Sequence, residues 1–94
     1  MADASFQDYF NTALAYSGLT EREKAFIGLA VTLSRGCEPS SAGRIQRALD
    51  SGIPQADLDA AINLTAAVNA GVVRAIARRG YSQPACDTGG AAKK

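Results

Sequence analysis

The chain has 94 residues and a formal net charge of +1, with 47% hydrophobic and 20% charged residues. This length allows one small domain with a single core, and the composition is that of a globular rather than a disordered protein. A charge so close to zero predicts no general attraction to nucleic acid, acidic lipid or acidic substrates.

The first predicted helix begins at Ser5, which is followed three residues later by Asp8 in the arrangement of a capping box. Aromatic residues including Phe6 and Phe10 recur at helical spacing, and Gly18 predicts the end of the helix. We expect this aromatic stripe to lie in the core or at a subunit interface rather than to form a ligand cage.

Thr20 and Glu23 predict a second capping box. The helix that follows is apolar on most sides, and Gly36 predicts its end. A helix without a polar face packs on several neighbours, so we expect this one to lie centrally.

Pro39 fits the first turn of a third helix, where its missing N–H leaves no hydrogen bond unmade. The pattern predicts that this helix buries Ile45, Ala48 and Leu49 and that it ends at Gly52.

Pro54 predicts the start of a fourth helix that continues towards Gly80. Asn69 and Gly71 lie within it and lower the helical propensity, so they predict a kink or the close approach of another backbone.

No segment carries a strand signal, so the predicted class is all-α with about four to five helices. Residues 1–81 form the predicted helical domain, and residues 82–94 form a C-terminal tail predicted to be disordered. No stretch approaches the roughly 20 apolar residues of a membrane span, and no secretory signal is recognised. We therefore expect a cytoplasmic protein without membrane contact, whose cysteines are reduced.

Cys37 stands at the start of the third helix, and Ser40, Ser41 and Arg44 follow at offsets that place them on one helical face. A helix start favours the thiolate, and Arg44 can stabilise it or bind an anionic substrate. This arrangement would suit a one-cysteine peroxidase that is reduced by an external thiol. Alternatively, Cys37 is a small apolar residue packed between two helices, an interpretation that the sequence slightly favours.

Residues 19–77 resemble the alkylhydroperoxidase-D-like domain of the carboxymuconolactone decarboxylase family. Two segments carry the resemblance, LTEREKAFIGLAVTLSRGCEP and RIQRALDSGIPQADLDAAI. The resemblance implies an antiparallel helical bundle that assembles as dimers, trimers or hexamers.

Redox members of that family have a Cys-x-x-Cys pair, a histidine four residues later and a glutamate on the preceding helix. By this resemblance Cys37 matches the first cysteine, while Ser40 and Arg44 occupy the positions of the second cysteine and the histidine. The glutamate position falls near Ala25, and the chain contains no histidine. The resemblance therefore implies a divergent member whose two-thiol centre has been lost.

Other groups of residues carry weaker signals. Cys86 either couples with Cys37 from the tail or is an incidental thiol. The cluster of Arg74, Arg78 and Arg79 near a helix end is explained by the helix dipole. The carboxylates lie mostly at helix starts, so no metal site and no cofactor are predicted.

Three functions remain open from the sequence. The first is residual thiol-dependent, peroxiredoxin-like peroxidase activity through Cys37 with an external thiol reductant. The second is a non-enzymatic homo-oligomeric binding or scaffold protein. The third is a nucleic-acid-binding module in which Arg44 and Arg47 follow a tight turn, and the near-neutral charge makes it the least favoured.

Overall fold

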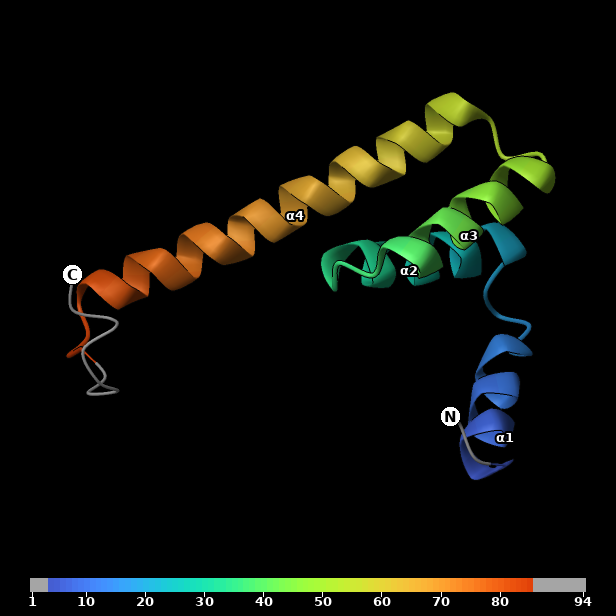
Figure 1. Ribbon diagram of the computed structural model, residues 1–94, viewed down its shortest axis with the longest axis horizontal. Coiled ribbons are helices and arrows are strands. Elements are labelled where there is room, and N and C mark those ends of the chain that lie inside the picture. The colour runs from blue at the N-terminus through green and yellow to red at the C-terminus, as the bar shows by residue number, and fades with distance from the viewer. Residues whose placement is uncertain (1–3, 86–94) are drawn as a thin grey trace.

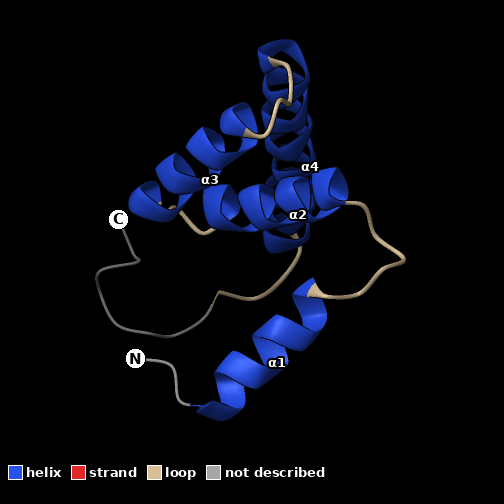
Figure 2. Ribbon diagram, turned by 90° about the vertical axis from the view of Figure 1, so that its right-hand side faces the viewer, coloured by secondary structure: helices blue, strands red, loops and turns tan. Residues whose placement is uncertain are grey.

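The computed structural model describes residues 4–85, and this part of the chain contains four helices and no strand. The helices are α1 (Ala4–Leu14), α2 (Glu21–Ser34), α3 (Glu38–Asp50) and α4 (Gln55–Tyr81) (Figures 1 and 2). The predicted all-α class is therefore confirmed. Residues 86–94, which make up most of the predicted tail, lie outside the described residues.

Local signals place the ends of α2 and α3 where the sequence predicted them. Thr20 Oγ1 accepts a hydrogen bond from the Glu23 N–H at 3.0 Å, and Glu23 Oε1 accepts one from the Thr20 N–H at 2.8 Å. This capping box satisfies two N–H groups at the start of α2. After α2 and α3, Gly36 and Gly52 adopt left-handed φ values of 73° and 97°. Such values favour glycine, which explains why both helices end there.

The first helix differs from its prediction. It begins at Ala4, so Ser5 lies inside the helix instead of capping it, and it ends at Leu14, well before Gly18. The rings of Phe6 and Phe10 stack with their centroids 6.0 Å apart. Tyr9 is 73% exposed, and Phe10 and Leu14 are also exposed. The aromatic stripe is therefore not part of the core of a single chain.

Helices α2 and α4 run parallel to one another. Near their starts Arg22 Nη2 lies 2.7 Å from Asp57 Oδ2, and further along Asn69 Nδ2 donates to Ser34 Oγ at 2.7 Å. In both contacts the two residues are 35 positions apart in the sequence, so the two helices stay in register over this length. Helix α3 returns beside α2 in the opposite direction (Figure 2). Helix α2 contacts both α3 and α4, in agreement with the predicted central position.

The core of the described chain is small. Its buried apolar residues are Leu29, Ala48, Ile53 and Leu58, and five partly buried side chains pack against them: Ala25, Phe26, Leu33, Ile45 and Ile62. Leu49 was predicted to be buried but is 37% exposed. It follows Ala48 directly, and neighbouring residues of a helix point about 100° apart, so only one of the two faces α2.

Helix α4 runs without interruption past Asn69 and Gly71, and its second half extends beyond the other helices (Figure 1). A Cβ at Gly71 would meet no atom within 4 Å, so no backbone of the described chain approaches there. The radius of gyration is 18.1 Å, against about 12 Å for a compact domain of this length. The helices of one chain therefore do not close into a compact bundle.

By length and composition alone, α4 is one helix that could cross a membrane. This finding differs from the sequence-based expectation that no stretch would approach such a span. The polar residues Asn63, Asn69 and Arg74 interrupt its apolar surface, and Asn69 hydrogen-bonds to α2. These features are those of a helix that packs against protein.

Candidate functional site

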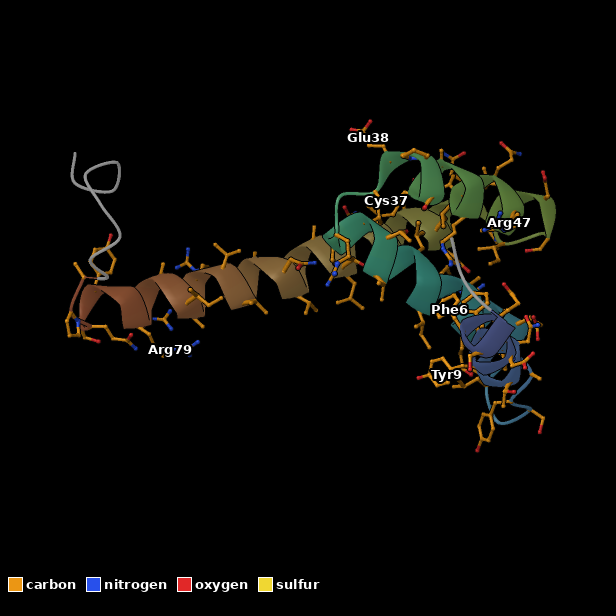
Figure 3. The ribbon with its side chains drawn as sticks, turned by 60° about the horizontal axis from the view of Figure 1, so that its bottom comes forward. Phe6, Tyr9, Cys37, Glu38, Arg47 and Arg79 are labelled. Carbon is orange, nitrogen blue, oxygen red and sulfur yellow. The ribbon has the colours of Figure 1, made fainter. Side chains whose placement is uncertain are left out.

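Cys37 is the N-cap residue of α3, at the joint between α2 and α3 (Figure 3). Its backbone N–H donates to the carbonyl of Thr32 at 3.0 Å, which fixes the chain entering the helix. Its side chain is partly exposed, and the thiol donates to Ser40 Oγ at 2.8 Å. The two residues that the sequence placed one helical turn apart therefore form a direct contact.

Ser40 lowers the pKa of the Cys37 thiol. The main cause is the hydrogen bond with the Ser40 hydroxyl, and the backbone N–H of Ser40 adds to it. Both groups stabilise the thiolate more than the neutral thiol, whereas partial desolvation acts in the opposite direction. A thiol at a helix start with two hydrogen-bond partners has the environment of a reactive cysteine.

Ser41 has a structural role instead of a place beside the thiol. It is 6% exposed, and its hydroxyl donates to Thr32 Oγ1 at 3.1 Å. The Thr32 hydroxyl in turn donates to the carbonyl of Leu29 at 3.1 Å. This short chain of hydrogen bonds ties α3 to α2 directly beneath the joint that carries Cys37.

Arg44 does not join Cys37 and Ser40 in one site. Its guanidinium lies against α2 at Gly28, where a Cβ would come within 2.7 Å of Arg44 Cζ. Arg44 and Arg47 line a cavity of about 420 Å³ that does not include Cys37. Arg44 is seven residues from the thiol, or roughly 10 Å along the helix axis. Figure 3 accordingly shows Cys37 and Arg47 towards opposite ends of α3.

The contact at Gly28 was not foreseen from the sequence. A glycine inside a predicted helix indicates a close approach in general, but it does not identify the partner. The partner is known only when α3 is placed beside α2, because Gly28 and Arg44 belong to different helices.

Among the described residues, the site around Cys37 has one thiol. The chain contains no histidine, and Ala25, near the expected glutamate position, lines the arginine cavity. Cys37 is the free cysteine of the described residues, while Cys86 lies outside them. Within residues 4–85, no three acidic or cysteine side chains are grouped to hold a metal ion.

Comparison with protein families now identifies the chain. Residues 2–79 match the carboxymuconolactone decarboxylase family, which covers most of the sequence. The chain therefore belongs to this family, as the segments around Cys37 suggested. Comparison with curated proteins and with solved structures finds no significant match.

Proposed function

We propose that this protein is a thiol-dependent peroxidase that acts through Cys37 alone. The observation that carries the proposal is the contact between Cys37 Sγ and Ser40 Oγ at 2.8 Å, at a partly exposed helix start. The lowered pKa increases the fraction of nucleophilic thiolate near neutral pH. Ser40 stands where redox members of the family have a second thiol, so the mechanism uses one cysteine.

The reaction then has two stages. In the first, the Cys37 thiolate attacks one peroxide oxygen, the O–O bond breaks, and the released alkoxide takes a proton from solvent. Sulfur is oxidised to a sulfenic acid, and the peroxide is reduced to an alcohol or water. In the second, an external thiol condenses with the sulfenic acid and releases water. A second external thiol cleaves this mixed disulfide and regenerates the Cys37 thiol. Low-molecular-weight thiols that could act as this external reductant are present in the reducing cytoplasm, where we propose that the protein is located.

The test compares Cys37→Ser with Cys86→Ser in the full-length chain. Peroxide consumption is measured in the presence of excess dithiothreitol, and sulfenic acid is trapped with dimedone and located by mass spectrometry. We expect Cys37→Ser to abolish both signals and Cys86→Ser to leave both unchanged. Equal peroxide consumption by the wild type and Cys37→Ser would refute the proposed activity.

We also propose that copies of the chain associate through α4, because one chain leaves too much apolar surface uncovered. Within the described residues, α4 exposes Leu64, Val68, Val72, Val73 and Ile76, each by more than half of its surface. Covering such side chains with apolar atoms of a second copy would be favourable. The exposed side chains Val68, Val72 and Ile76 supply an apolar face for such an interface.

Self-association through α4 is compatible with both a reactive and an unreactive Cys37. If Cys37 proves unreactive, the same association supports the alternative of a non-enzymatic binding or scaffold protein. The peroxidase test therefore separates the two functions, while the test of assembly, through residues of α4, is independent of both.

A further inference from the structure

A cavity lined by arginine side chains lies apart from Cys37. It is the cavity of about 420 Å³ between the start of α2 and the end of α3. Its charged lining consists of Arg22, Arg44, Arg47 and Glu21, and its apolar lining includes Ala48 and Ile53. Arg22 is paired with Asp57, which leaves Arg44 and Arg47 against Glu21 and gives the cavity a positive character that the near-neutral chain as a whole does not have.

The three arginines differ in their partners. Arg22 binds Asp57 at 2.7 Å, and its guanidinium lies 5.1 Å from the ring centre of Phe26. Among the described residues, neither Arg44 nor Arg47 has a carboxylate within ion-pair distance. The cavity therefore presents two guanidinium groups whose charge is not used inside the described part of the chain.

Arg44 is also held in position. The Arg44 guanidinium lies against α2 at Gly28, which has no side chain. A Cβ at position 28 would overlap the guanidinium. The residue is partly buried. A guanidinium that is already restrained loses less conformational entropy when it binds a ligand.

We propose that this cavity binds a small molecule through an oxyanion group, a carboxylate or a phosphate, held by Arg44 and Arg47. The planar guanidinium matches both groups with paired hydrogen bonds. The cavity has the size of a site for a metabolite, and Ala48 and Ile53 can contact the apolar part of such a ligand. The site is separate from Cys37, so it does not depend on peroxidase activity.

The experiment titrates the full-length protein by calorimetry with inorganic phosphate and, separately, with succinate. We expect saturable binding of at least one probe, and the tighter one identifies the preferred oxyanion. Arg44→Gln and Arg47→Gln should each weaken binding about tenfold, since each removes a charged hydrogen-bond donor. Glu21→Gln should not weaken binding, because Glu21 pairs with Lys24 at 3.2 Å and its side chain is 93% exposed.

Arg79→Gln is the matched control, since Arg79 lies in the last turn of α4, far from Arg47 on α3 (Figure 3). It removes the same charge and should change the affinity less than twofold. Gly28→Ala should weaken binding by displacing Arg44, and Arg44→Lys should weaken it while keeping the charge. Circular dichroism of each variant reports whether it is folded.

Two results would overturn the proposal. One is the absence of saturable binding of both probes to the wild type. The other is an equal loss of affinity in Arg79→Gln and Arg44→Gln, which would show that net charge alone attracts the anion. Peroxide consumption is measured separately from anion binding and does not involve this cavity. Failure of the anion site is therefore distinguishable from failure of the thiol chemistry.

Discussion

Cys37 and Ser40 show how a single side-chain contact can alter a site. The hydroxyl at position 40 lies 2.8 Å from the thiol, at the position where the family resemblance implied a second cysteine. A second thiol there would allow disulfide formation, whereas the hydroxyl stabilises the thiolate and cannot be oxidised with it. With a hydroxyl at position 40, this contact lowers the pKa of the Cys37 thiol but cannot form a disulfide with it.

Ser40→Ala should shift the alkylation profile of Cys37 towards higher pH. The hydrogen bond with Ser40 lowers the pKa, so its loss raises the pKa and reduces the thiolate fraction at neutral pH. We expect the alkylation rate at pH 7 to fall about threefold to tenfold, because the variant loses one hydrogen bond to a charged group. The rate is measured by mass spectrometry after timed exposure to iodoacetamide across a pH series.

Ser82→Ala is the control for this experiment. The Ser82 hydroxyl donates to the carbonyl of Arg79 at 3.1 Å at the end of α4, remote in sequence from the thiol. Its substitution should leave the profile of Cys37 unchanged. An unchanged profile in Ser40→Ala as well would contradict the assigned cause of the lowered pKa.

At the level of the helices, capping chemistry decides where α2 begins. Thr20 and Glu23 exchange hydrogen bonds of 3.0 and 2.8 Å, and Lys24 interacts with both Glu21 and the carbonyl of Leu14. The start of α2 is therefore held by its capping box and is also linked, through Lys24, to the end of α1. Because α2 contacts both α3 and α4, its stability affects the whole packed unit.

Thr20→Ala should lower the free energy of unfolding by about 1 kcal/mol, since it removes the side-chain acceptor of the capping box. Urea unfolding followed by circular dichroism measures the change. Thr12→Ala makes the same chemical change at an exposed position within α1, where it removes no N-cap. It should change the free energy by less than about 0.5 kcal/mol. Equal losses in the two variants would show that the cap does not stabilise the fold.

For the whole molecule, the decisive feature is the continuous face of α4. Leu58, Ile62 and Asn69 lie on the side that packs towards α2, and Val72 and Ile76 follow at the same helical spacing. Beyond Asn69 this face has no cover within the described chain, and Val72 and Ile76 are 52% and 56% exposed. A second copy would complete the packing that α2 begins.

Val72→Glu combined with Ile76→Glu should dissociate the proposed assembly. Burying a carboxylate in an apolar interface is costly, so the charged variant should remain monomeric. Light scattering coupled to size exclusion measures the mass, with Ala67→Glu as the control on the opposite face of α4. A monomeric wild type would refute self-association. Flotation of the wild type with lipid vesicles would instead assign the face to a membrane.

Most of the helices could be predicted from local signals. The capping box at Thr20, the proline at position 39 and the glycines at positions 36 and 52 each act on their own segment of backbone. The contact of Cys37 with Ser40 was predictable for the same reason, because residues three apart are neighbours on any helix. The early end of α1 is the exception, since no single residue there enforces a boundary.

The sequence by itself determined the all-α class, the family, and the thiol with its serine partner, because these follow from neighbours along the chain. Only the tertiary structure decided that Arg44 lies against Gly28, away from Cys37, and that Leu49 is exposed. It also decided that half of α4 is uncovered (Figure 1). Helical periodicity fixes which side chains share a face. The neighbour that covers the face depends on the loops and on packing between distant segments.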